Sequence, residues 1–222
     1  MRALLLSSLV LLLAGCATQT VTSDGLVSQP SSGLDEFYVR PNAGLPAYRS
    51  VMIGPVAVQF RSDWLKQEHA YNRIQYPARS SGTYQDAETM SKDMSELMHA
   101  DLVAAFARRG YQIVDAPGPG VLQVSATIGD LFINAPDRLS SSLQASASRE
   151  VGQATLSLEA RDSNRVVVAR VVHKAIARQT PRSSLASDGN NQLWLDATFR
   201  RWAENCAAEL GGPRSAQASL RN

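Results

Sequence analysis

Apolar residues recur every three or four positions in two parts of the chain, which predicts two amphipathic helices. The first is expected over residues 86–109, with acidic residues at its start, arginines at its end and Gly110 as the cap. The second, near the C-terminus, has one apolar stripe made of Leu195, Phe199, Trp202, Cys206 and Leu210. Because Cys206 lies on this stripe, we expect its thiol to be buried.

Alternation of apolar and polar residues predicts strands around these helices. The first, over residues 48–60, is interrupted at Gly54 and Pro55, and since proline cannot donate to a ladder it must bend, bulge or lie at an edge there. Short strands are expected at residues 111–114 and 122–128. Two long strands, at residues 154–160 and 167–177, should form a hairpin around the polar turn at residues 162–165.

This order of elements predicts an α+β fold, an α/β sandwich in which two helices pack on one face of a mixed or antiparallel sheet. We expect about five strands. The other face of the sheet should be half polar, because Arg170, Lys174 and Arg178 alternate with aliphatic residues on the last strand. That face is expected to meet water or a partner.

The N-terminus has the three parts of an export signal: Arg2, an apolar run over residues 3–13, and small residues before Cys16. A helix that spans a membrane needs about 20 apolar residues, so this run is too short to be one. Leu13-Ala14-Gly15-Cys16 resembles the lipobox of bacterial lipoproteins. That resemblance implies cleavage before Cys16, a diacylglyceryl thioether on its sulfur and fatty acyl chains such as palmitate on the new N-terminus. An ordinary signal peptide with a chance cysteine is the alternative.

The resemblance also bears on localisation, because the residue after Cys16 is Ala17 rather than aspartate. In enteric-type bacteria an aspartate there commonly retains a lipoprotein in the inner membrane. We therefore expect an outer-membrane lipoprotein whose domain faces the periplasm, with the inner membrane as the alternative.

Four regions follow from these patterns. Residues 1–15 are expected to be the signal peptide, and residues 16–33, rich in threonine, serine, glutamine and glycine, a lipidated flexible tether. Residues 34–210 are expected to form a single α+β domain. Residues 211–222, with two glycines and a proline, are expected to be a disordered tail.

Charge and motifs exclude several functions. The 22 basic and 20 acidic side chains are balanced, and no dense basic block indicates nucleic acid. The histidines, His69, His99 and His173, are far apart on three different elements, which disfavours a metal site. No Gly-x-Ser-x-Gly elbow or glycine-rich phosphate loop is present. We expect no catalytic residue, no metal and no cofactor.

Two groups of side chains are weak candidates for ligand binding. Aromatic residues alternate with cations between residues 61 and 84, and such rings can hold a glycan, a peptide or a protein surface; they are Trp64, Tyr71, Tyr76 and Tyr84. The alternative is that these rings pack the connection onto the sheet. Met90, Met94 and Met98 could form a pliable groove, although a core surface is the preferred interpretation.

A second resemblance covers roughly residues 34–210. Residues 37–48, which lead into residues 51–58, are similar to a family of proteobacterial lipoproteins described only as a domain of unknown function. The segments at residues 151–154 and 159–163 also fit that family's paired C-terminal strands. The resemblance implies an outer-membrane or periplasmic lipoprotein and carries over no catalytic residue.

Together these features predict a non-enzymatic lipoprotein with a binding or scaffolding role in the cell envelope. Its partners would be the membrane, through lipid on Cys16, and an envelope protein. One alternative is an auxiliary lipoprotein of a transporter or secretion system. Another is an envelope hydrolase using His173 or His99, which would require serine, histidine and carboxylate groups to converge in one pocket.

Overall fold

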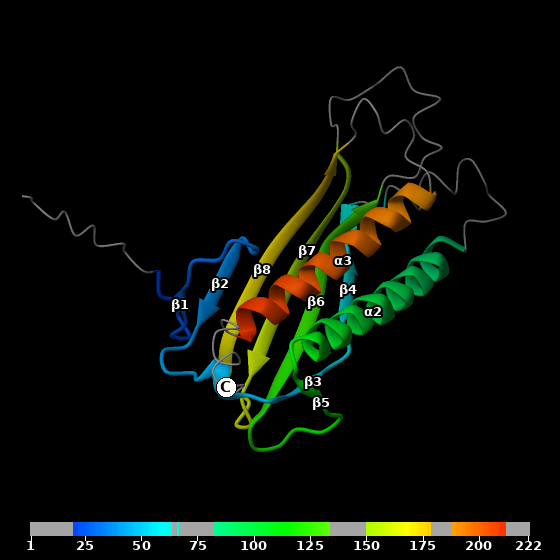
Figure 1. Ribbon diagram of the computed structural model, residues 1–222. Helices are drawn as coiled ribbons and strands as arrows, with labels where there is room; N and C mark the ends of the chain where they lie inside the picture. The colour runs from blue at the N-terminus through cyan, green and yellow to red at the C-terminus, as the bar shows by residue number, and fades with distance from the viewer. Residues whose placement is uncertain (1–19, 64–65, 67–81, 134–149, 179–187, 212–222) are drawn as a thin grey trace, which may run out of the picture.

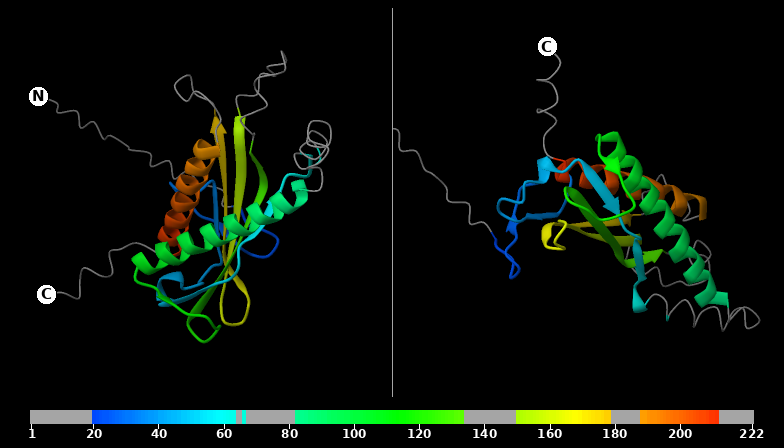
Figure 2. Two further views of the ribbon diagram at one scale, coloured as in Figure 1. Left: turned by 90° about the vertical axis from the view of Figure 1, so that its right-hand side faces the viewer. Right: turned by 90° about the horizontal axis from the view of Figure 1, so that it is seen from below.

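The computed structural model describes residues 20–63, 66, 82–133, 150–178 and 188–211 (Figure 1). Within these residues, eight strands form one mixed sheet. Two long helices, α2 (Gly82–Arg108) and α3 (Asp188–Leu210), lie side by side on one face of it (Figures 1 and 2). The α+β class is confirmed. No described helix combines the length and the apolar character that crossing a bilayer would require.

The prediction of about five strands is wrong. The sheet has two further short strands at its N-terminal edge, and the strand predicted over residues 48–60 is divided into two. The order across the sheet is β1-β2-β8-β7-β6-β3-β5, and β4 also pairs with β6. Neighbours from β1 to β6 are antiparallel, whereas β3, β4 and β5 join in parallel. The strands are β1 (Val27–Ser28), β2 (Glu36–Val39), β3 (Ser50–Ile53), β4 (Ala57–Phe60), β5 (Gln112–Ile113), β6 (Val121–Ile133), β7 (Glu150–Arg161) and β8 (Val167–Arg178). A short 3₁₀ helix, η1 (Leu45–Ala47), precedes β3.

The predicted interruption at Pro55 is confirmed. β3 pairs with residues 121–124 of β6, and β4 pairs with residues 127–131 of the same strand. Between them the amide of Gly54 still donates to the carbonyl of Val124 at 2.9 Å. Residues 50–60 therefore follow β6 as one long strand that breaks where proline removes the donor.

Helix α2 lies along β3 and β4 and supplies polar side chains to them. Ser91 Oγ and Ser95 Oγ donate to the carbonyls of Val58 and Val56, at 3.4 and 2.6 Å. One helical turn further on, His99 Nε2 lies 3.2 Å from the carbonyl of Ile53. Because the three positions are spaced by four residues, they share one side of the helix. This row ties the helix to strand carbonyls that need partners.

The core lies between the helices and the sheet. All five residues of the predicted stripe on α3 are buried, and Cys206 is fully enclosed, as expected. Met94 and Met98 belong to the same core, which confirms the preferred interpretation of the methionines. From the sheet, the inward positions are fully or almost fully buried: Leu122, Val124, Ala126, Ile128, Ala154, Leu156, Leu158 and Ala160. The predicted hairpin between β7 and β8 is also present.

The folded part of the chain begins earlier than the predicted boundary at residue 34. Val27 and Ser28 form β1, which pairs with β2, and Val21 makes a bridge to Val27. Leu26 is fully buried. The prediction of a flexible tether over residues 16–33 is thus wrong for residues 20–33. The segment has no apolar period because it folds as short turns and edge strands whose polar groups bond to the backbone, such as Thr22 to Leu26.

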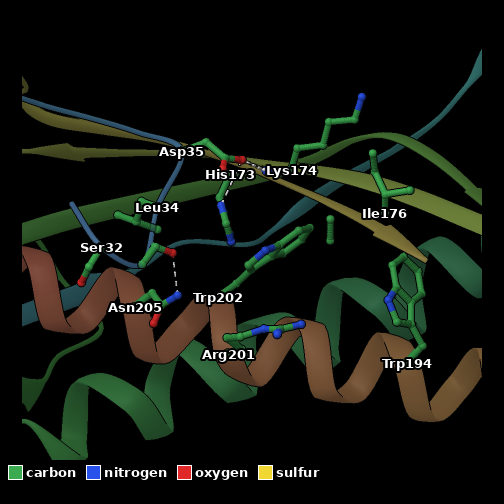
Figure 3. A pocket seen from close by; sticks show the side chains of 12 residues that line it. Ser32, Leu34, Asp35, His173, Lys174, Ile176, Trp194, Arg201, Trp202 and Asn205 are labelled. Atoms are coloured by element: carbon green, nitrogen blue, oxygen red, sulfur yellow. Dashed lines mark hydrogen bonds and ion pairs between the residues drawn. The ribbon is translucent and has the colours of Figure 1, made fainter. Parts of the chain in front are cut away.

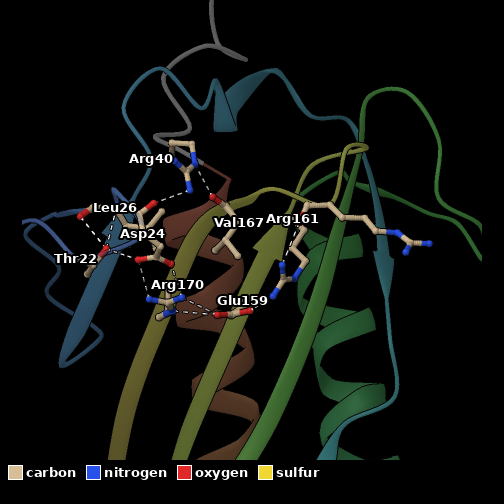
Figure 4. Close-up of polar contacts among 9 residues, drawn as sticks. Thr22, Asp24, Leu26, Arg40, Glu159, Arg161, Val167 and Arg170 are labelled. Atoms are coloured by element: carbon tan, nitrogen blue, oxygen red, sulfur yellow. Dashed lines mark hydrogen bonds and ion pairs between the residues drawn. The ribbon is translucent and has the colours of Figure 1, made fainter.

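The sheet face turned away from the helices has a network of charged side chains (Figure 4). Arg170 on β8 pairs with Asp24 in the N-terminal segment at 2.7 Å and with Glu159 on β7 at 2.9 Å. Glu159 also pairs with Arg161. The face is half polar as predicted, but at this end Arg170 is paired within the chain. The two carboxylates raise the pKa of Arg170.

Asp24 gives this network a pH dependence. A hydrogen bond from the Thr22 hydroxyl, and then the Arg170 guanidinium, lower the pKa of Asp24 from 3.8 to about 2. Since the folded-state pKa is depressed, the stabilisation is fully present above pH 3.8 and is lost as the pH falls through about 2. We expect Asp24→Asn to lower stability modestly at neutral pH and to flatten the loss of stability across that window. Urea unfolding at a series of acidic pH values measures both effects.

Asp115→Asn is the matched control, because Asp115 is exposed and forms no ion pair with another described residue. Its acid profile should follow that of the unmodified protein. If the acid profile of Asp24→Asn also matched that of the unmodified protein, the network would contribute nothing to stability.

Candidate functional site

The candidate site lies where β8 continues past the end of β2. The last residue pair between these strands joins Glu36 to Val172, whereas β8 runs on to Arg178. Beyond this pair no described strand covers the outer edge of β8. Because backbone groups alternate between the two sides of a strand, the outer edge presents the N–H and C=O groups of every second residue.

Asp35, the residue before β2, occupies the first free position of this edge. Its Oδ2 accepts a hydrogen bond of 2.7 Å from the backbone amide of Lys174. The same oxygen lies 3.1 Å from Nδ1 of His173, which is ion-pair distance without hydrogen-bond alignment. The carboxylate thus takes the place of the carbonyl that a longer β2 would offer, and it lies against the His173 ring, which lines a pocket.

The pocket lies between the end of β8, helix α3 and residues 32–35, with a volume of about 440 Å³ (Figure 3). That volume falls within the usual range of small-ligand sites. Trp202 forms its inner wall, edge-on to His173 with ring centroids 6.2 Å apart. Trp194 and Ile176 flank the far end, and the guanidinium of Arg201 lies beside Trp202.

Two contacts hold residues 31–34 against α3 on the other side of the pocket. Ser31 Oγ donates to Glu209 at 2.6 Å and accepts from the amides of Gly33 and Leu34. Asn205 Nδ2 donates to the carbonyl of Gly33 at 2.6 Å. A Cβ at Gly33 would lie 2.9 Å from Asn205 Cγ, so a larger residue here would have to displace the Asn205 amide. These hydrogen bonds therefore fix the polar wall of the pocket, residues 31–34, against α3.

The pocket contains the three residue types of a hydrolytic triad, but they are not aligned as one. Ser32, Asp35 and His173 all line it, so a serine, a histidine and a carboxylate do share one pocket. However, His173 makes no hydrogen bond to Ser32, whose side chain Figure 3 places away from the imidazole. A hydrolytic triad requires the base to contact the nucleophile. Among the described residues, no three His, Cys, Asp or Glu side chains gather closely enough to hold a metal ion.

Most of the site residues predicted from the sequence cannot be placed relative to this pocket. Trp64, Tyr71, Tyr76, His69 and Cys16 lie outside the described residues, and Tyr84 lies in the first turns of α2. His99 is half-buried on α2, and its Nε2 lies within hydrogen-bond distance of the Ile53 carbonyl. Among the candidates whose side chains the structure describes, His173 lines the pocket and His99 does not.

The pocket is also lined by four residues that were not predicted from the sequence: Asp35, Trp194, Arg201 and Asn205. Three of them follow the helical spacing of the core stripe. Trp194, Arg201 and Asn205 are separated by seven and four residues, and each comes directly before a residue of that stripe: Leu195, Trp202 and Cys206. A polar and aromatic border along an apolar stripe was thus the available signal. Asp35 carried no such signal, because its role depends on where β2 ends.

Cys206 lies on α3 within the core and is not part of the site. Burial raises the pKa of its thiol to about 12. Since the thiolate is the reactive form, we expect Cys206 to resist maleimide and disulfide reagents in the folded protein at about pH 8 and to react once the protein is unfolded in guanidinium. A Cys16→Ser background leaves it as the single thiol. Rapid labelling of the native protein would contradict the buried position.

Comparison with known proteins identifies one family. Residues 17–204 match the model of DUF3313, which is described as a protein of unknown function. No curated protein matches the chain.

Proposed function

The chain belongs to the DUF3313 family, and we propose that it is a lipid-anchored binding protein of the bacterial cell envelope, without catalytic activity. The observation that carries the proposal is the pocket at the end of β8. It combines a suitable volume with aromatic, amide and cationic side chains, and its histidine does not contact a nucleophile. Such a lining is typical of recognition.

The anchor is the second part of the proposal. Lipid on Cys16 would place the domain on a membrane, and two or more acyl chains would hold it there stably. The described residues begin at Thr20, whose carbonyl accepts a hydrogen bond from the amide of Ser28 in β1. Four residue steps separate Thr20 from Cys16, and they can span no more than about 14 Å, from about 3.5 Å each. The β1 edge of the sheet would therefore lie close to the bilayer. The absence of an aspartate after Cys16 supports the outer membrane rather than the inner membrane as that bilayer.

Cross-linking in intact cells of the native host tests this proposal. We expect the full-length chain, purified after cross-linking, to recover one envelope protein repeatedly and in stoichiometric amount. The Cys16→Ser chain is the control, since it should recover less of that protein if anchoring brings the two together. Repeated recovery of no partner would contradict the binding role, and hydrolysis of an envelope ester or amide that His173→Ala abolishes would replace it with an enzymatic one.

A further inference from the structure

The outer edge of β8 beyond β2 has the geometry of an acceptor for one more strand. The amide of Lys174 points to this edge, because Asp35 receives it there. Alternation along the strand then directs the amide and carbonyl of Ile176 to the same edge. The register of β8 on β7 is regular from Ala169 to Ile176, so this alternation is unbroken. Unpaired backbone groups on an edge are a template for pairing with another chain.

The same register decides which side chains would meet such a strand. Ala175 and Ala177 have the same orientation as Val171 and His173, toward α3. Both are small, so a side chain opposite Ala175 on an added strand would have room to enter the pocket. There it would meet Trp202, Trp194 and the guanidinium of Arg201 (Figure 3).

Charge limits what that side chain can be. Arg201 is exposed and has no ion-pair partner among the described residues, and the same holds for Lys174 on the edge itself. The one carboxylate of the pocket, Asp35, already accepts the Lys174 amide. A carboxylate entering from an added strand would therefore find an unpaired cation in a partly enclosed site.

We propose that the edge of β8 at residues 174–178 binds an extended peptide segment of a partner protein by strand addition, with an aspartate or glutamate of that segment paired to Arg201. The segment occupies the place that a longer β2 would take, and it runs antiparallel to β8. Main-chain hydrogen bonds to Ile176 supply affinity and the acidic side chain supplies selectivity. This inference rests on the proposed binding function and names its partner class.

The probe is a short acetylated peptide of alternating threonine and valine with a central glutamate, and the matched probe has lysine in place of the glutamate. We expect the full chain to bind the acidic probe more tightly, measured by fluorescence anisotropy. Hydrogen exchange at the amide of Ile176 should slow when the acidic probe is bound. Equal binding of the two probes, or an unprotected Ile176 amide, would overturn the proposal.

Two variants separate the backbone from the side-chain contribution. Arg201→Glu should lower the affinity for the acidic probe by about tenfold, so that the chain then prefers the lysine probe. Arg200→Glu, one residue earlier on α3 and also exposed, should bind like the unmodified chain. Ile176→Pro removes an edge donor that β7 does not use and should abolish binding of both probes. An Arg201→Glu chain with unchanged preference would overturn the assignment even if Ile176→Pro fails to fold.

The outcomes also distinguish this inference from the proposed function. If cross-linking recovers the same envelope partner with Arg201→Glu and with the unmodified chain, the binding function stands and the β8 edge is not where the partner binds. If the unmodified chain recovers no partner, the proposed function fails, and the inference about a partner segment fails with it.

Discussion

Replacing Trp202 with alanine is expected to lower the free energy of unfolding by about 3–5 kcal/mol, the usual cost of truncating a large buried aromatic residue. The side chain is 1% exposed. It stacks on Phe199 with centroids 5.8 Å apart and an interplanar angle of 25°, and its edge meets His173. Removing the ring would leave a cavity between α3 and the end of β8, where rigid strands and a long helix limit collapse.

Guanidinium unfolding followed by circular dichroism measures this effect. Leu193→Ala is the matched control, because this substitution also removes a large apolar side chain from the same helix. The Leu193 side chain, however, is 68% exposed. Its stability should change by less than about 0.5 kcal/mol. A Trp202→Ala chain as stable as the Leu193→Ala chain would show that α3 does not pack on the sheet through this residue.

The elements could be predicted from the sequence where buried residues recur at the regular spacing of a helix or a strand. The stripe from Leu195 to Leu210 and the alternating positions of β6 and β7 are buried as their patterns predict. The break at Pro55 was also predictable, since the loss of a backbone donor is a local property. These elements define the α+β class and the side of the sheet on which the helices pack.

The short edge strands were not predictable, because β1 and β2 depend on contacts distant in sequence. Val27 and Ser28 pair with β2, and β2 pairs in turn with residues 169–172 of β8. Two and four residues are too few for a period to be visible. The site depends on the same contacts, since Asp35 meets Lys174 across 139 positions of sequence. His173 was therefore visible as a candidate without its carboxylate or its pocket.

Replacing Cys16 with serine should leave no lipidated protein at all, the largest change expected for any single residue. Serine has no thiol to form the thioether, and without that modification cleavage before residue 16 should not occur. The chain should accumulate as the uncut precursor. Mass spectrometry of protein from the native host, with detergent phase partitioning, distinguishes the precursor from a mature acylated chain.

Cys206→Ala is the matched control, because it removes the other cysteine from a fully buried position. That chain should still be cleaved and acylated, and it should partition into detergent like the unmodified protein. Each buried methylene contributes about 0.8 kcal/mol, so two or more acyl chains dominate the partitioning. A Cys16→Ser chain that still enters the detergent phase in a mature, acylated form would disprove the anchor, and with it the placement of the β1 edge beside the membrane.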